Sequence, residues 1–151
     1  MPSILIVDDS TAIRESFKEI LSPLAECEEA VNGQAAVDLV KRRINQGKPF
    51  DLVLMDIIMP EKDGLTAVKE IRQFEHRRGC RESDCLTIVI VTTIREPSRI
   101  LVAQYECGAD AYITKPFTGE TVLQTLSGNG LKINPDRRDD LAVRSNGGFF
   151  K

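Results

Sequence analysis

Two short apolar segments that end abruptly in carboxylates constrain the fold of this chain more than any other feature. Residues 3–7 run into Asp8 and Asp9, and residues 52–55 run into Asp56. Continuous apolar runs without alternation are typical of strands that a parallel sheet buries on both faces. Open parallel sheets bind ligands beyond the carboxyl ends of their strands, so each acid stands where a site would form. For either position alone, an Asp that only caps the next segment is the simpler alternative.

The remaining apolar segments continue this pattern. We expect strands over residues 3–7, 27–31, 51–56, 86–91 and 111–114, each followed by a helix. The helix starts are marked by Ser10, Gly33, Gly64, Pro97 and Thr118. Charged neighbours make residues 27–31 the weakest strand, as expected at a sheet edge. Because such alternation gives parallel strands with right-handed crossovers, we predict an α/β fold, a three-layer, doubly wound (βα)5 sandwich around a five-stranded parallel sheet.

Length and charge exclude several classes of protein. The 151 residues leave room for one domain with a buried core. A formal net charge of −3 argues against a protein that binds nucleic acid mainly by electrostatics. No apolar run approaches the roughly 18 residues of a membrane span, and the N-terminus lacks the basic segment of a signal peptide. We therefore expect a cytoplasmic protein that engages neither membrane nor nucleic acid.

The composition changes near the end of the chain. From residue 128 it is dominated by Gly, Asn, Asp, Arg and Ser, with few apolar residues. We expect residues 1–127 to form the domain and residues 128–151 a flexible tail. The tail is too short for a helix-turn-helix or catalytic module, so no output domain is expected. Phe149 and Phe150 would suit docking to a partner, although a disordered end is the simpler interpretation.

Four cysteines, Cys27, Cys80, Cys85 and Cys107, raise the question of a metal or disulfide. A reducing compartment would keep them as thiols. Cys80 and Cys85 are five residues apart in a polar loop, but no further Cys or His pair stands nearby to complete four zinc ligands. We therefore interpret all four as free thiols rather than as a structural metal site.

Polar residues stand at the C-terminal tips of four predicted strands: Asp8 and Asp9, Asp56, Thr92, and Lys115. Because the tips of parallel strands share one edge, these side chains should converge. Three acids this close would raise one another's pKa unless a cation joined them, and oxygen ligands select a hard ion such as Mg²⁺. With a Lys and a Thr, the set suits a phosphoryl group, whose charge it would neutralise. An Asp can also act as the nucleophile and form an acyl phosphate.

These residues lie in four motifs, ILIVDDS, DLVLMDIIMPEKDG, IVIVTT and GADAYITKPF. Through them the sequence resembles, over about residues 2–127, the CheY-like receiver domain of bacterial two-component response regulators. The resemblance implies a flavodoxin-like sheet with strand order 2-1-3-4-5 and a Mg²⁺ cofactor. It also implies a phosphoprotein that is not an enzyme, because a receiver catalyses only its own phosphorylation and dephosphorylation.

The resemblance carries roles to individual acids. In the family, an Asp at the position of Asp56 accepts a phosphoryl group from a histidine kinase. Asp9 and Asp56 would bind Mg²⁺ directly, together with the backbone carbonyl of Ile58. Asp8 would act largely through water.

The resemblance also implies a switch. Thr92 would bond a phosphoryl oxygen, and Lys115 would pair with the phosphoryl group, before what is usually a cis peptide to Pro116. Tyr112 matches the aromatic residue that rotates inward when Thr92 moves toward the phosphoryl group. Taken alone, Tyr112 would be ordinary strand packing.

The implied function is a stand-alone response regulator in a phosphorelay. A sensor histidine kinase would phosphorylate it, and the surface around the fourth helix, fifth strand and fifth helix would switch to bind a downstream effector protein. The alternative is a phosphocarrier that passes the group to a histidine phosphotransfer protein. A monomer and a phosphorylation-dependent dimer both fit. The sequence names neither the kinase nor the target.

Three positions depart from the common pattern. Ile58 and Ile94, each two residues beyond Asp56 or Thr92, occupy sites that in this family often carry polar residues and modulate dephosphorylation. Two apolar side chains there would exclude the attacking water, which predicts a long-lived phosphoryl group. Thr93 is larger than the usual Ala or Ser and would narrow access for small phosphodonors.

Two other classes share parts of the pattern. A Mg²⁺-dependent phosphatase of the haloacid-dehalogenase type also uses an aspartyl nucleophile, but it needs Asp-x-Asp after the first strand, whereas Asp8 and Asp9 are adjacent. A flavodoxin-like FMN carrier shares the strand alternation. Its phosphate loop needs small, uncharged residues where this chain places two acids. Turnover of a phosphate ester or a yellow purified protein would favour these rivals.

Overall fold

A five-stranded, all-parallel sheet forms the centre of the computed structural model, with the strand order β2-β1-β3-β4-β5. The structure describes residues 1–59, 62–81, 85–94 and 96–129. Its strands are β1 (Ser3–Val7), β2 (Glu26–Ala30), β3 (Leu52–Asp56), β4 (Thr87–Thr92) and β5 (Ala111–Thr114). Its helices are α1 (Thr11–Leu21), α2 (Gly33–Asn45), α3 (Gly64–Arg77), α4 (Pro97–Cys107) and α5 (Gly119–Gly128). The predicted doubly wound fold and strand order are therefore confirmed.

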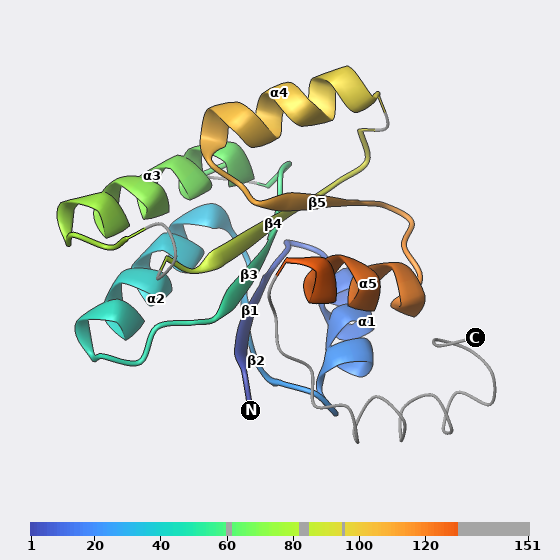
Figure 1. Cartoon of the computed structure of the whole chain (residues 1–151). Coiled ribbons are helices and arrows are strands. Elements are labelled where there is room, and N and C mark those ends of the chain that lie inside the picture. Colours follow the sequence, from blue (N-terminus) through green and yellow to red (C-terminus); the bar gives the residue numbers. More distant parts are fainter. Residues whose placement is uncertain (60–61, 82–84, 95, 130–151) are drawn as a thin grey trace.

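The helices cover the sheet in two layers, as Figure 1 shows. On one face, α2, α3 and α4 pack over a core that includes Val40, Ile71 and Cys107. On the other, α1 and α5 pack over a core that includes Phe17 and Leu126. Because both faces are covered, the central strands are apolar between their ends and lack the alternation of a half-exposed strand.

Strand boundaries differ from the sequence-based prediction by one residue. The edge strand β2 ends at Ala30, which pairs with Val7, and the next residue, Val31, is 51% exposed. Strand β4 extends to Thr92, because its pairing with β5 continues to that residue. The predicted edge position of β2 is confirmed by the strand order.

Side-chain caps set the starts of the helices around the carboxyl edge of the sheet. Ser10 accepts a hydrogen bond from the backbone N–H of Ile13, and Asp63 accepts one from that of Thr66. Thr118 caps α5 in the same way. Each cap satisfies a backbone donor that the first helical turn leaves unpaired. The chain therefore enters α1 and α5 within a few residues of the tips of β1 and β5, whereas residues 57–63 separate β3 from α3.

Some expectations fall outside the described residues. These are the tail from residue 130 on, including Phe149 and Phe150, and residues 82–84 of the loop between α3 and β4. In the part of the chain that the structure describes, no helix is both long and apolar enough to cross a membrane.

Candidate functional site

The carboxyl edge of the sheet brings the predicted polar residues together. Strand β1 pairs with β3 so that Val7 lies beside Met55, which places the following residues, Asp8 and Asp56, next to each other. Strand β4 ends at Thr92, which pairs with Thr114 of β5, so Lys115 follows on the adjacent tip. Parallel register alone therefore assembles the cluster.

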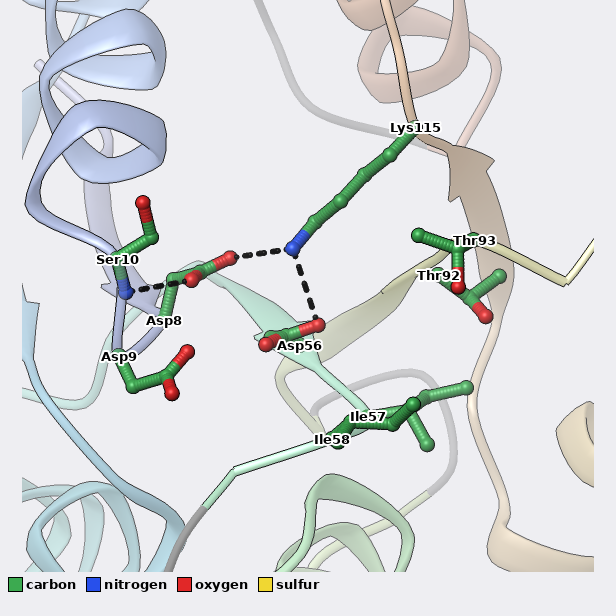
Figure 2. Close-up of a pocket in the computed structure, with 9 residues that line it drawn as sticks. All are labelled: Asp8, Asp9, Ser10, Asp56, Ile57, Ile58, Thr92, Thr93 and Lys115. Carbon is green, nitrogen blue, oxygen red and sulfur yellow. Dashed lines mark hydrogen bonds and ion pairs between the residues drawn. The ribbon is translucent and has the colours of Figure 1, made fainter.

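These side chains line a pocket of about 170 Å³. Its lining consists of Asp8, Asp9, Ser10, Asp56, Ile57, Ile58, Thr92, Thr93 and Lys115, shown in Figure 2. Asp8, Asp56 and Thr92 are at most 6% exposed and form its floor, whereas Asp9 and Ile58 are exposed at its mouth. The pocket is small beside the roughly 300–1,000 Å³ of sites that enclose drug-sized ligands. Its volume suits a phosphate-sized anion and disfavours a flavin.

Lys115 reaches across the pocket to two carboxylates. Its Nζ lies 2.9 Å from Oδ2 of Asp8 and 3.2 Å from Oδ1 of Asp56 (Figure 2). Its backbone N–H donates to the carbonyl of Thr92 at 2.7 Å. The peptide bond that follows, to Pro116, is cis, as predicted. The ammonium is therefore anchored at its backbone and aimed at the two buried acids.

The charges in the pocket perturb one another. Burial raises the pKa of Asp56, and the negative charge of Asp8 raises it further, against the opposing effect of Lys115. Burial alone would lower the pKa of Lys115, but the hydrogen bond to Asp8 and the charge of Asp56 outweigh it, so that pKa is raised. Burial first, and then the excess of negative charge around a single ammonium, keep the ionised form of Asp56 disfavoured.

The three acids form a group that fits a hard cation. One carboxylate oxygen each of Asp8, Asp9 and Asp56 lies within 4.8 Å of the others. Oxygen ligands of this kind suit Mg²⁺, which takes one or two carboxylates and completes its shell with water and phosphate oxygens. The uncompensated charge at Asp56 gives an independent reason for a cation here. The residues present therefore fit a divalent metal.

Two of the predicted residues are placed apart from the pocket. Tyr112 lies on β5 beside Ile90, is 38% exposed, and does not belong to the pocket lining. Ile94 is partly buried against the core under α2, α3 and α4, and also lies outside the lining, whereas Ile58 belongs to it. Of the two isoleucines expected to exclude water, only Ile58 therefore borders the pocket.

Three backbone contacts at the site did not emerge from the sequence. The N–H of Ser10 donates to Oδ1 of Asp8 at 2.9 Å, and the N–H of Ile94 donates to Oγ1 of Thr92 at 3.0 Å. In both contacts a side-chain oxygen accepts the backbone N–H of the residue two positions later, a local turn that Asp and Thr can form. The N–H of Gly64 donates to the carbonyl of Ile57 at 2.8 Å and closes the loop after Asp56. The contact between Asp8 and the N–H of Ser10 could have been predicted, because an Asp after a strand often forms such a turn.

Comparison with known proteins identifies the family. A family model described as the response regulator receiver domain matches residues 4–127. The chain is 38% identical over 125 residues to the chemotaxis protein CheY of Halobacterium salinarum, a match covering 82% of this chain and 92% of that protein. It is 36% identical over 126 residues to CheY of Bacillus subtilis, covering 82% and 93%.

Solved structures agree with these matches. The structure of CheY4 from Vibrio cholerae, crystallised at low pH, superimposes with a TM-score of 0.70 at 28% identity, covering 85% of this chain and 98% of that one. The receiver domain of the histidine kinase CKI1 from Arabidopsis thaliana, complexed with Mg²⁺, gives 0.67 at 29% identity, covering 84% and 88%. This chain belongs to the response regulator receiver family, the CheY-like phosphoacceptor domains of two-component signalling.

Proposed function

We propose that this protein is a receiver that accepts a phosphoryl group on Asp56 from a sensor histidine kinase. The observation that carries the proposal is the position of the Asp56 carboxylate, which lines the pocket between the ammonium of Lys115 and the hydroxyl-bearing tip of β4. The transfer needs a nucleophile, charge neutralisation and a hydrogen-bond donor in one place. Asp56, Lys115 and Thr92 are suited to these three roles, and all three line the pocket.

Asp56 acts as the nucleophile. An oxygen of its carboxylate attacks the phosphorus of a phosphohistidine, the N–P bond breaks, and the imidazole keeps the electron pair and takes a proton. The product is an acyl phosphate on Asp56. Strand β3 holds the acceptor rigidly, since Asp56 is the last residue in register with β4. This fixes the carboxylate for an in-line approach through the mouth of the pocket.

Asp9 and Asp56, with the backbone carbonyl of Ile58, would hold Mg²⁺ directly, and Asp8 would hold it through water. When bound, the metal would supply positive charge that offsets the charge of the carboxylates and of the phosphoryl group. Lys115 gives up its contact with Asp56 and pairs with a phosphoryl oxygen, remaining anchored by Asp8. Thr92, only 3% exposed, donates its hydroxyl to another oxygen.

The output is a change of surface. When the hydroxyl of Thr92 moves toward the phosphoryl group, it vacates space behind β4, and the half-exposed Tyr112 of the neighbouring strand rotates inward. The surface formed by α4, β5 and α5 then differs between the two states, and an effector protein binds one of them. A histidine phosphotransfer protein is the alternative recipient. Rapid loss of phosphate to such a protein, without gain of affinity for an effector, would identify a carrier.

Beryllofluoride with Mg²⁺ tests the proposal, because it mimics an acyl phosphate without turnover. Amide NMR spectra of the wild type should shift around Asp56, Thr92 and Tyr112 only when both reagents are present. The Asp56→Asn variant should not respond, and Thr92→Ala should respond near Asp56 but not at Tyr112. Because Thr93 narrows access for small donors, phosphorylation by a histidine kinase is the parallel assay. A wild type inert to both would contradict the proposal.

A further inference from the structure

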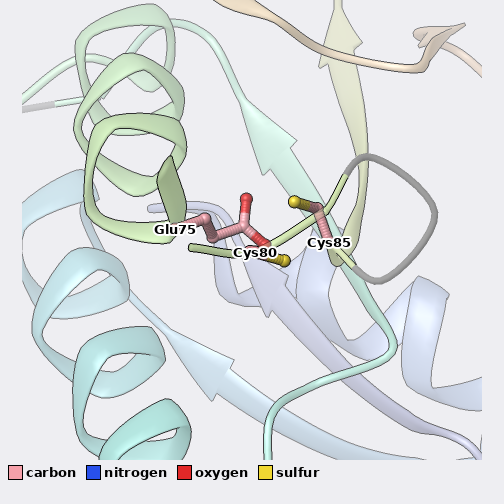
Figure 3. Close-up of side chains that lie close together, drawn as sticks. All are labelled: Glu75, Cys80 and Cys85. Atoms are coloured by element: carbon pink, nitrogen blue, oxygen red, sulfur yellow. The ribbon is translucent and has the colours of Figure 1, made fainter. Parts of the chain in front are cut away.

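A second cluster of reactive side chains lies at the N-terminal end of β4, opposite the acidic pocket, where α3 leads into that strand. The Sγ atoms of Cys80 and Cys85 and a carboxylate oxygen of Glu75 all lie within 4.8 Å of one another (Figure 3). Both cysteines are partly exposed, whereas Glu75 is only 4% exposed. All four cysteines of the chain lie in its described part, and none forms a disulfide there. The cluster plays no part in the function proposed above.

The backbone of the loop brings the two thiols together. The N–H of Cys80 donates to the carbonyl of Glu75 at 3.0 Å, which ends α3 with a tight turn. The N–H of Cys85 donates to the carbonyl of Arg81, also at 3.0 Å, which brings Cys85 next to the residue that follows Cys80. The two side chains point into the same space from opposite ends of this loop, as Figure 3 shows. A disulfide requires this proximity without large backbone movement.

The carboxylate of Glu75 is already engaged. Its Oε1 pairs with Nη1 of Arg72 at 2.8 Å, and its Oε2 accepts the N–H of Leu86 at 2.8 Å. Any cation at the cluster would therefore lie beside a guanidinium and would compete with it for Glu75. A metal would also require thiolates next to a fixed negative charge. This environment disfavours a metal site, which needs charged thiolates, and favours an uncharged form of the two cysteines.

The same environment distinguishes the two thiols. Burial, a hydrogen bond with Cys80 and the charge of Glu75 raise the pKa of Cys85 to about 12. Cys85 is therefore a poor initial nucleophile in its resting state, because the thiolate is the reactive form. The Sγ of Cys80 lies 3.6 Å from the carbonyl of Arg81 in a solvent-exposed contact. This assigns Cys80 as the attacking thiol and Cys85 as the one that closes the ring.

We propose that Cys80 and Cys85 form a reversible intramolecular disulfide by exchange with a low-molecular-weight disulfide such as oxidised glutathione. The thiolate of Cys80 attacks one sulfur of the small disulfide, whose S–S bond breaks and releases one small thiolate, which takes up the proton lost by Cys80. The thiolate of Cys85 then attacks the sulfur of Cys80 in the mixed disulfide. The second small thiolate leaves and takes up the proton of Cys85. Two protein thiols are oxidised and one small disulfide is reduced to two thiols.

The disulfide would sit at the start of the strand that carries Thr92 at its other end. Strand β4 has six residues, so the two edges are about 20 Å apart. Closing the ring fixes the loop that leads into β4 and leaves the acidic pocket chemically unchanged. The modification site is therefore independent of phosphoryl acceptance, and either can fail without the other.

The experiment uses the full chain, equilibrated in buffers of oxidised and reduced glutathione and then alkylated after unfolding. Before alkylation, the wild type should be lighter than its reduced form by about 2 Da, the mass of two hydrogens. After alkylation, two of its four thiols should remain unmodified, and the peptide map should show Cys80 linked to Cys85. The Cys85→Ser variant should stop at a mixed disulfide on Cys80. The control Cys27→Ser should close the ring as the wild type does, and excess dithiothreitol should reopen it.

A second variant tests the role of the carboxylate. Glu75→Gln keeps one acceptor oxygen, enough for the N–H of Leu86 but not also for Arg72. It removes the charge beside Cys85, so ring closure should become several-fold faster at neutral pH. Four free thiols at every glutathione ratio would overturn the proposal, as would a stable mixed disulfide on the wild type or a disulfide that includes Cys27 or Cys107. Protection of both cysteines by Zn²⁺ alone, with no disulfide under any condition, would assign a metal site instead.

Discussion

The Nζ of Lys115 lies 3.2 Å from Oδ1 of Asp56, although 59 residues separate the two in the sequence. The same ammonium contacts Asp8 at 2.9 Å, so one cation holds two buried carboxylates in place. This arrangement keeps the acceptor oriented before a phosphoryl group arrives. It also makes the stability of the domain depend on the charges that the function requires.

Removal of the ammonium should therefore destabilise the metal-free protein. We expect Lys115→Met to lower the free energy of unfolding by about 3 kcal/mol, because it leaves the charges of Asp8 and Asp56 unpaired in a buried site. Millimolar Mg²⁺ should recover much of this loss. Urea denaturation with and without Mg²⁺ measures both effects. The control Lys18→Met breaks a surface pair with Glu29 and should cost about 1 kcal/mol or less, independently of Mg²⁺. Equal losses in the two variants would contradict the account.

Neutralisation of the acceptor should stabilise the metal-free protein at neutral pH. Burial and Asp8 raise the folded-state pKa of Asp56 above its unfolded value. The ionised group then costs stability above the folded pKa, and this cost vanishes below the unfolded pKa. Asp56→Asn should be more stable than the wild type by on the order of 1 kcal/mol at pH 7. The difference should shrink as the pH falls through the raised pKa.

Chemical denaturation in EDTA across pH 3–7 (roughly the range of carboxyl titration) measures this difference. The control Asp38→Asn alters an exposed acid of α2 that accepts a hydrogen bond from Gln34. It should change stability little at any pH. An Asp56→Asn variant less stable than the wild type at pH 7 would show that the pair with Lys115 outweighs burial and Asp8.

The loop after Asp56 should tolerate no side chain at Gly64. A Cβ there would lie 2.0 Å from the backbone oxygen of Asp56 and 2.8 Å from its carbonyl carbon. Gly64→Ala must therefore displace backbone at the acceptor, and we expect a loss of about 2 kcal/mol in unfolding free energy. Phosphoryl uptake should fall with it. The control Gly128→Ala, where a Cβ has nothing within 4 Å, should retain both. Normal uptake by Gly64→Ala would show that the loop is more adaptable than this geometry implies.

The lifetime of the phosphoryl group should depend on Ile58. This side chain is 72% exposed and borders the pocket, so it covers the approach of water with an apolar surface. Ile58→Asn should speed dephosphorylation by on the order of ten-fold, because an amide can position the attacking water. The decay of phosphorylated protein after removal of donor measures this rate. Leu101→Asn, which replaces a similarly exposed residue of α4 (61%), should not change it. Loss of phosphate from the wild type within seconds would contradict the prediction.

Much of the fold and the composition of the site could be predicted from the sequence. Continuous apolar strands require cover on both faces, and parallel strands place their tips on one edge. Asp8, Asp56, Thr92 and Lys115 therefore converge for topological reasons that need no knowledge of side-chain packing. The family resemblance then supplied the strand order, which the pattern alone did not provide.

The sequence could not predict the side-chain positions that depend on how the chain turns after each strand tip. Ile58 and Ile94 occupy equivalent positions in the sequence, yet one borders the pocket and the other packs against the core. The apolar pattern does not predict the burial of Glu75, although Glu75 follows Ile71 by four residues on the buried face of α3. Its buried carboxylate is paired by Arg72 of the same helix and by the N–H of Leu86, the residue before β4.

The most direct measurement of the central claim is the intact mass of the protein after incubation with Mg²⁺ and a phosphodonor, first acetyl phosphate and then a phosphorylated histidine kinase. The wild type should gain one phosphoryl group, about 80 Da, in a form labile to hydroxylamine, as an acyl phosphate is. Asp56→Asn should gain none, EDTA should abolish the gain, and the exposed-acid control Asp38→Asn should behave as the wild type. No gain by the wild type from either donor, or an equal gain by Asp56→Asn, would contradict the assignment of Asp56 as the phosphoryl acceptor.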